Sequence, residues 1–394
     1  MVLESARKRI PQLCDKLLSS LCIHNLGFAI QDLPEEILTD ILSRLPVGCV
    51  LKCRRVCKQW LALTSTPQFV EMHVKQATPV LLLQFVDSDY SNKMLDVFIF
   101  DERAKANKMF KKMGADLMNL NVPHWLQLCG SCNGLLVFCQ RFPRVYFVCN
   151  PLTGGKISIT PPVQSGEVCG FFFHPIVKDY RLLFVHWEGI QFIYSIYSLG
   201  NQLWRKLDNF PYQPVSLARP TILNGALHWM ADRAPCSNSI MIFNMDTERL
   251  RNMPDPGGHY CSWQLHNDLS IFEMNGKLAF CCLAKNKSLV YMSVLDDYEN
   301  WIWENSCLID LDLVVKCSFK DDCLNSNITL LDIQDNELLF DWEFRGVFRY
   351  NLRQNTVKQI SSIGMKEVLH PKLRGPNIHV IPYTKTFVLP SGFK

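Results

Sequence analysis

How the first part of this chain folds is decided by DLPEEILTDILSRLP, residues 32–46. Its apolar positions recur at steps of 4, 1, 3, 1 and 3, which is one stripe at the period of an α-helix. Asp32 is suited to cap this helix, with Pro34 in the first turn and Glu35 three residues after the cap. Proline cannot continue a helix, so Pro46 ends it.

Two shorter helices are predicted after Pro46. The first spans residues 47–52, and the second spans residues 53–63 and presents Cys53, Val56, Cys57 and Trp60. A Thr-Ser-Thr-Pro sequence at 64–67 closes the segment. A unit of about forty residues is near the lower size limit for a self-sufficient hydrophobic core. We therefore expect this unit to be stabilised by packing against a partner.

Beyond Pro79 the sequence changes to short apolar strands between turn signals. Asn-Gly pairs stand at 133–134, 224–225 and 275–276, and a related Asp-Asn pair stands at 335–336. Asn-Gly suits the two positive φ angles of a type I′ turn, so each pair predicts a hairpin. The one helical pattern in this part spans Glu102–Met113.

The turn signals are spaced like repeats. The intervals between them are 91, 51 and 60 residues, and Asp179-Tyr180-Arg181 divides the first into 46 and 45. A repeated four-stranded unit of about 40–50 residues is the sequence sign of a β-propeller. With the strands at 80–85 and 97–101, the count is about six blades. The apolar stretch Ile378–Leu389 is expected to pair with the first unit and close the ring, which removes exposed sheet edges.

Composition indicates a folded protein and excludes several classes. Of 394 residues, 48% are hydrophobic and 20% are charged, as in ordinary globular domains. The net charge of +4 is too small to indicate a nucleic-acid binder. No apolar run approaches the ~20 residues of a membrane-spanning helix, and polar residues after Pro11 interrupt any signal-peptide core. We therefore expect a protein of the nucleus and/or cytoplasm that binds neither nucleic acid nor membrane.

The residues that could carry chemistry do not form a reactive site. The 17 cysteines are odd in number and lie mostly inside apolar runs, which predicts reduced core thiols. Cys129 and Cys132 have redox or half-zinc spacing, but no second pair completes a zinc site and the motif leads into a hairpin. The same turn lacks the strand–turn–helix context of a nucleophile elbow. We expect no catalytic residue, no metal and no cofactor.

Two groups of residues are candidates for contact with a partner. A basic cluster on the third predicted helix is either a solvated face or a complement to an acidic partner; it comprises Lys52, Arg54, Arg55 and Lys58. His259, Tyr260 and Trp263 follow a stretch rich in turn formers, so they are candidates for a target-binding loop. Tyr and Trp are common interface anchors. The alternative is that Trp263 fills space between blades.

Residues 31–70 closely resemble the F-box, through Leu-Pro-x-x-Ile-Leu at 33–38 and Val-Cys-Lys-x-Trp at 56–60. This resemblance implies a module that binds a Skp-type adaptor and, through it, cullin and RING subunits. It also implies that the helical core or the adaptor-facing surface is formed by Leu33, Pro34, Ile37, Leu38, Ile41, Leu42, Leu45, Pro46, Val50, Leu51, Val56, Cys57 and Trp60.

Residues 79–390 resemble the F-box-associated domains of plants, sometimes called kelch-like. The resembling sequences are Gly-Ser-Cys-Asn-Gly at 130–134, Asn-Pro-Leu-Thr at 150–153, Asp-Tyr-Arg at 179–181 and Asn-Gly-Ala-Leu-His-Trp at 224–229. With an extension at 1–30, the chain is expected to be a multidomain α+β protein: a three-helix F-box followed by a large all-β propeller-like domain.

The resemblance implies a substrate-recognition adaptor of a Skp–cullin–F-box E3 ubiquitin ligase, which binds a target protein through the β domain and catalyses nothing itself. The alternatives are a non-degradative F-box scaffold, a lectin-like binding protein, and a propeller-based hydrolase or oxidoreductase. The last lacks a convergent set of titratable residues.

Overall fold

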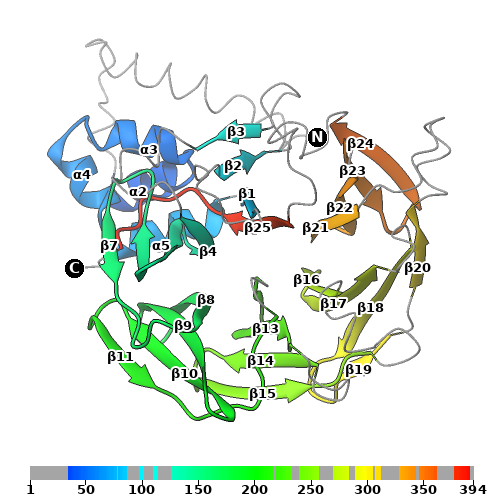
Figure 1. Ribbon diagram of the computed structural model, residues 1–394. Helices are drawn as coiled ribbons and strands as arrows, with labels where there is room; N and C mark the ends of the chain where they lie inside the picture. Colours follow the sequence, from blue (N-terminus) through cyan, green and yellow to red (C-terminus); the bar gives the residue numbers. More distant parts are fainter. Residues whose placement is uncertain are drawn as a thin grey trace.

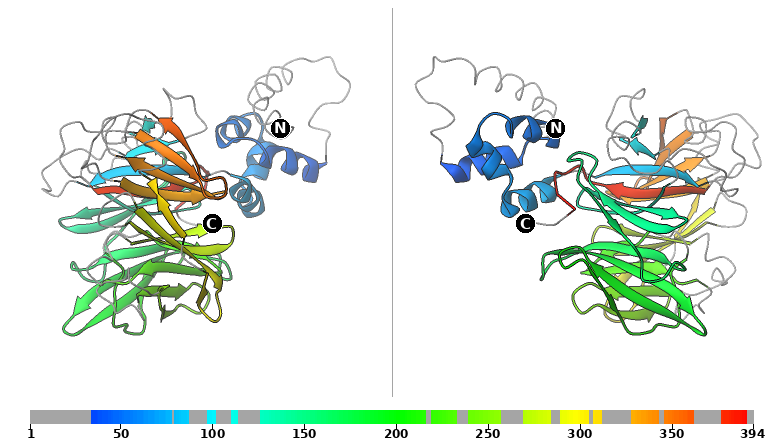
Figure 2. Two further views of the ribbon diagram at one scale, coloured as in Figure 1. Left: turned by 90° about the vertical axis from the view of Figure 1, so that its right-hand side faces the viewer. Right: turned by 60° about the vertical axis from the view of Figure 1, so that its left-hand side comes forward.

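The computed structural model describes residues 34–77, 79–86, 97–101, 110–113, 126–215, 219–232, 239–256, 269–283, 289–304, 307–311, 328–342, 346–361 and 377–390. A small helical unit comes first and a ring of β-sheets follows (Figure 1). Figure 2 shows the helices on one face of the ring. The expected division into a helical module and an all-β domain is confirmed.

The helical unit contains α2 (Glu35–Ser43), α3 (Val47–Cys53), α4 (Lys58–Thr64) and α5 (Pro67–Gln76). Pro34, and not Asp32, occupies the cap position of α2, and no side chain caps that helix. The carbonyl of Pro34 accepts hydrogen bonds from the amides of Ile37 and Leu38, both at 3.1 Å. The helix therefore begins at the residue after the proline, whose fixed φ suits a helix entry.

Two further differences from the predicted helices have local causes. The third helix begins at Lys58 instead of Cys53, because the Cys57 sulfur caps it by accepting from the Trp60 amide at 3.5 Å. The fourth helix, α5, was not predicted. Thr66 belongs to the sequence interpreted as a terminator, yet its hydroxyl oxygen accepts from the Phe69 amide at 3.2 Å and starts α5.

The β part is a ring of six sheets, as expected from the repeat count. Blade 1 has the order β25 (Asn377–Tyr383), β1 (Val80–Val86), β2 (Val97–Phe100), β3 (Phe110–Lys112), and blade 2 follows with β4 (Gln127–Cys132), β5 (Leu135–Arg141), β6 (Arg144–Cys149), β7 (Lys156–Ile159). Blade 3 contains β8 (Glu167–His174), β9 (Asp179–Glu188), β10 (Gln191–Ser198) and β11 (Leu203–Lys206).

The other three blades repeat this meander. Blade 4 contains β12 (Thr221–Leu223), β13 (Ala226–Met230), β14 (Ile240–Asn244) and β15 (Arg249–Met253). Blade 5 contains β16 (Leu269–Met274), β17 (Lys277–Leu283), β18 (Leu289–Asp297) and β19 (Ile302–Trp303), and β20 (Cys307–Asp310) also pairs with β18. Blade 6 contains β21 (Ile328–Gln334), β22 (Glu337–Trp342), β23 (Gly346–Asn351) and β24 (Thr356–Ser361).

The ring closes as predicted, because β25 pairs antiparallel with β1 over its whole length, from Val80↔Tyr383 to Val86↔Asn377. The last strand of the chain thus completes the first blade. The helix predicted at Glu102–Met113 is wrong where the structure describes it, since Phe110–Lys112 form β3 and pair with β2. Pairing to a neighbouring strand has overridden the local helical pattern there.

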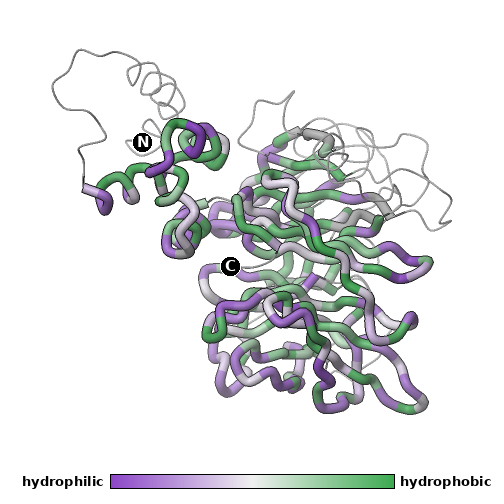
Figure 3. The backbone as a smooth tube through the Cα atoms, turned by 90° about the vertical axis from the view of Figure 1, so that its left-hand side faces the viewer, coloured by the Kyte–Doolittle hydropathy of each residue, from purple (hydrophilic) through white to green (hydrophobic). Residues whose placement is uncertain are grey.

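Positive φ angles define the first hairpin of four blades, as the turn pairs predicted. The φ values are 47° and 84° at Asn133-Gly134, 47° and 69° at Asn224-Gly225, 52° and 80° at Asn275-Gly276, and 50° and 61° at Asp335-Asn336. Two consecutive positive φ angles are the mark of a type I′ turn. In Figure 3 hydrophobic stretches run through the strands, whereas many turns are hydrophilic.

The core lies mainly between neighbouring blades. Phe172 of blade 3 and Trp229 and Phe243 of blade 4 belong to one buried cluster. The other interfaces are filled in the same way, for example by Cys281 and Phe340 between blades 5 and 6. The cysteines that the structure describes are all free, which agrees with the expectation of reduced thiols.

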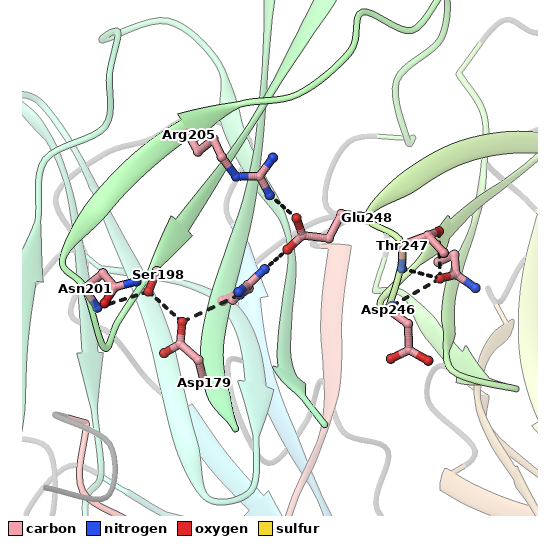
Figure 4. Close-up of polar contacts among 9 residues, drawn as sticks. Asp179, Ser198, Asn201, Arg205, Asp246, Thr247 and Glu248 are labelled. Carbon is pink, nitrogen blue, oxygen red and sulfur yellow. Dashed lines mark hydrogen bonds and ion pairs between the residues drawn. The ribbon is translucent and has the colours of Figure 1, made fainter. Parts of the chain in front are cut away.

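The Asp-Tyr-Arg motif joins blade 3 to both of its neighbours. Asp179 accepts from the Ser198 hydroxyl at 2.6 Å and from the Gly200 amide at 2.9 Å, which fixes the β10–β11 turn. The Tyr180 hydroxyl accepts from Asn133 Nδ2 of blade 2 at 3.2 Å. On the other side, Glu248 of blade 4 pairs with Arg181 and with Arg205 (Figure 4). The motif is therefore a clamp between blades 2, 3 and 4.

Removing the charge of Glu248 should weaken the ring. Arg181 and Glu248 are only 15% and 12% exposed, and Glu248→Gln leaves Arg181 with the carboxylate of Asp179, 3.6 Å away, as its remaining counter-charge. Losing the Glu248 pairing of this mostly buried arginine should cost about 2 kcal/mol of unfolding free energy. Thermal and urea melting would measure the loss. Asp296→Asn breaks the exposed Lys277–Asp296 pair and should change nothing measurable; equal effects of the two variants would contradict the clamp.

His228 joins blade 4 to blade 5. It is fully buried, with Nδ1 3.1 Å from the Thr221 carbonyl and Nε2 2.7 Å from the Tyr298 hydroxyl. Burial lowers the pKa of His228 to about 4, because the imidazolium would lose its hydration there. The folded ring therefore holds this histidine neutral.

Stability should consequently fall on acidification through the window between pH 6.5 and 4. Within it the unfolded chain binds a proton that the folded chain does not, so the unfolding free energy drops as pH falls. The expected loss from pH 7 to pH 5 is about 2 kcal/mol, measured by urea unfolding. His228→Asn should lose that slope. Burial also lowers the pKa of His73, but His73 is present in both the wild-type chain and the variant, so it contributes equally to both pH slopes. Identical pH slopes of stability for the two proteins would contradict the assignment to His228.

Candidate adaptor-binding and target-binding surfaces

The thirteen residues predicted for adaptor binding divide into a core and a surface. Leu38, Leu42, Val50 and Trp60 are at most 5% exposed and form the centre of the helical unit. Three apolar members are instead open to solvent: Ile37 at 48%, Ile41 at 41% and Val56 at 43%. Pro34 and Pro46 are also exposed, while Leu45, Leu51 and Cys57 are half-buried, and Leu33 lies outside the described residues.

The exposed apolar residues follow from helical geometry. Ile37 and Ile41 are four positions apart, so they lie on one face of α2, beside the face that buries Leu38 and Leu42. Leu61 of α4 is 44% exposed and was missed by the sequence prediction. The signal was present, because Leu61 follows the buried Trp60 directly and must point elsewhere. These exposed apolar side chains make this face the candidate surface for contact with a partner.

The basic cluster does not act as one unit. The Arg54 guanidinium donates to the Ser65 hydroxyl at 3.0 Å and lies 5.5 Å above the ring of Phe387, near the end of the chain. Arg55 and Lys58 are exposed. Burial raises the pKa of the neighbouring Cys53 thiol to about 11, so it stays protonated as part of the core.

The Cys129/Cys132 motif has the properties of packing residues. Both lie on β4, which leads into a hairpin. Burial raises the pKa of Cys132 to about 12, so its thiol is not an activated nucleophile. Within the described ranges, no group of three or more His, Cys, Asp or Glu side chains could hold a metal ion. No helix of that described part is long and apolar enough to cross a membrane.

His259, Tyr260 and Trp263, the predicted target-binding residues, lie outside the described residues. They belong to the connection between β15 and β16. Strands of a meander alternate in direction, so β15 ends and β16 begins at the face that also carries the β5–β6 and β9–β10 hairpins. Those two hairpins expose Phe142 and Ile190, at 89% and 91%. This is the face away from the helices, which lie beside the opposite ends of the strands (Figure 2).

The fold is therefore a helical module with an open apolar face, joined to a six-bladed propeller. Two family models match the chain: "F-box-like" over residues 30–71 and "F-box associated beta propeller domain" over residues 80–383. The chain belongs to the F-box-associated β-propeller family. Neither family description is that of an enzyme.

Several plant F-box proteins are similar to this chain in sequence. The chain is 26% identical to F-box protein At3g07870 of Arabidopsis thaliana, over 59% of this chain and 62% of that protein. It is 23% identical to F-box/kelch-repeat protein At3g23880 of the same plant, over 70% and 79%. A third, putative F-box protein At1g33530 from that plant, is 23% identical over 61% and 56%. The chain thus spans less than two thirds of the length of the first and third of these relatives.

Proposed function

We propose that this chain is the substrate receptor of a Skp–cullin–F-box ubiquitin ligase. The observation that carries the proposal is the open apolar face of Ile37, Ile41 and Val56 on an F-box that is fused to a propeller. An F-box binds Skp-type adaptors, and through that adaptor the chain is proposed to reach cullin and RING subunits. It is proposed to act in the nucleus and/or cytoplasm.

The proposed mechanism is proximity. A conjugating enzyme carries ubiquitin as a thioester, and the ε-amine of a target lysine attacks its carbonyl, so that an isopeptide bond forms and the thiol leaves. The receptor holds the target beside the thioester, which makes this transfer effectively intramolecular. No side chain of the receptor needs to enter the reaction.

A target protein is proposed to bind the propeller face away from the helices. Phe142 and Ile190 are large apolar side chains at hairpin tips on that face, and neighbouring Trp187 is 55% exposed. Aromatic and apolar anchors dominate the energetics of many interfaces. This placement keeps the target clear of the adaptor, which would occupy α2 and α4.

The test has two parts. The tagged full chain should co-purify with a Skp-type adaptor, cullin and RING subunits from plant cells. Proteins that bind the propeller should accumulate when the proteasome is inhibited. Absence of the adaptor would overturn the F-box role, and bound partners whose levels ignore the inhibitor would indicate a non-degradative scaffold.

A further inference from the structure

The segment after β25, Thr384–Pro390, lies between the F-box and the propeller (Figure 2). Although it is close to the end of the chain, Thr386, Phe387 and Val388 are only 1%, 3% and 2% exposed. A chain end is usually well solvated. Burial of three consecutive side chains therefore shows that this segment is held on both sides.

On the F-box side, Phe387 is the anchor. Its ring centroid lies 5.8 Å from that of Phe69 and 5.0 Å from that of His73, both on α5. The Arg54 guanidinium lies 5.5 Å above the same ring, in cation–π range. Phe387 thus contacts α5 and the end of α3 together.

On the propeller side, the segment is fixed by hydrogen bonds to blade 2. Asn150 is fully buried, and its Nδ2 donates to the carbonyls of Thr386 and Val388 at 2.9 and 2.8 Å. The Thr386 hydroxyl donates to the Asn133 carbonyl. A Cβ on Gly134 would overlap the Thr386 hydroxyl, so only glycine fits this turn.

A second pair of residues, near this segment, spans the F-box and the propeller. Lys75 and, more weakly, Lys178 lower the pKa of Glu71. Lys75 is on α5 like Glu71, whereas Lys178 is in the β8–β9 turn of blade 3. Glu71 and Lys178 therefore form a carboxylate–amine pair with one member on each of the two parts.

We propose that Thr384–Pro390 is a coupling segment that fixes the F-box at one orientation to the propeller, with Phe387 as its positioning residue. The functional consequence of this coupling rests on the proposed function. Proximity accelerates transfer only where the reacting groups meet in a defined geometry, so the bound target must be presented from a fixed direction. β25 closes the ring, and the residues directly after it orient the ring on the adaptor-binding module.

Carbodiimide crosslinking of the full chain, mapped by mass spectrometry, tests the coupling. A Glu71–Lys178 crosslink reports the approach of the two parts to each other, and Glu71–Lys75, 2.9 Å apart within α5, is the internal control. Phe387→Ala should lower the ratio of the first crosslink to the second by about tenfold, the effect of losing one buried anchor. Phe387→Leu should restore part of it, and Leu389→Ala, at a half-exposed position of the same segment, should leave the ratio unchanged.

A truncation after Lys385 gives a second variant that keeps β25. It should lose the Glu71–Lys178 crosslink while the propeller still melts cooperatively. An unchanged crosslink ratio in Phe387→Ala or in the truncated chain would overturn the coupling. Loss of propeller folding to the same extent in both of these variants would also overturn it. Adaptor co-purification from the same samples is read separately. If the wild-type chain binds no adaptor, the proposed function fails while the crosslink result still decides the coupling.

Discussion

Replacing Ile37 and Ile41 together by Asp should abolish adaptor binding while the chain stays folded. Both side chains are already open to solvent in the free protein, at 48% and 41%, so the substitutions cost little folding energy. In a complex they would place two carboxylates in an apolar contact. Loss of one interface anchor typically costs 2 kcal/mol or more, so two should weaken binding at least about a thousandfold. Calorimetry with a purified Skp-type adaptor would measure this.

Two matched variants separate binding from folding. Ile190→Asp introduces one such carboxylate at another exposed isoleucine, on the propeller face away from the helices. It should keep adaptor binding and weaken target binding. Leu42→Ala instead removes a core side chain that is 2% exposed, which should cost ~2–5 kcal/mol of stability in the helical unit. Wild-type adaptor affinity in the Ile37/Ile41 double variant would defeat the assignment.

Deleting residues 377–394 should unfold the propeller. The deletion removes β25, which pairs with all seven residues of β1, and three nearly buried apolar side chains of that strand: Val380, Ile381 and Tyr383. At about 2 kcal/mol each, their loss approaches 6 kcal/mol before the seven-residue ladder is counted, which is comparable to the whole stability of many domains. The edge of β1 would also be opened to aggregation.

Complementation provides the control for that deletion. A synthetic peptide of residues 377–390 should restore cooperative melting and a monomeric state, whereas a scrambled peptide of the same composition should not. Size-exclusion chromatography with light scattering and circular dichroism would follow both. A truncated chain that is monomeric and melts at the wild-type temperature without peptide would contradict closure by β25.

The local signals predicted the architecture well. Hairpin turns at the Asn-Gly pairs, the six-blade count and the pairing of the last apolar stretch with the first unit all depend on short-range chemistry or simple periodicity. The clamp made by Asp179 and Arg181 was visible as a motif, but its partner Glu248 was not. That pairing joins two blades and has no signature in the sequence.

Other features were beyond the sequence for physical reasons. The apolar stripe of α2 is wider than its buried face, because residues kept for a partner are as apolar as residues of the core. Periodicity therefore could not separate Ile37 from Leu38. The contact of Asn150 with Thr386 spans 236 positions of the chain. Such a contact depends on how the ring brings the chain end back to blade 2, which local patterns do not report.

The most direct test of the account is ubiquitin-remnant profiling of the propeller's neighbours in plant cells. Proximity labelling would identify these neighbours, and the full chain would be compared with its Ile37→Asp/Ile41→Asp variant. We expect the same neighbours in both cases, with ubiquitin-modified lysines on a subset of them only when the adaptor can bind. If the neighbours carry the same ubiquitin-modified lysines with the full chain and with its variant, the result would contradict a receptor that works by bringing targets to a ubiquitin ligase.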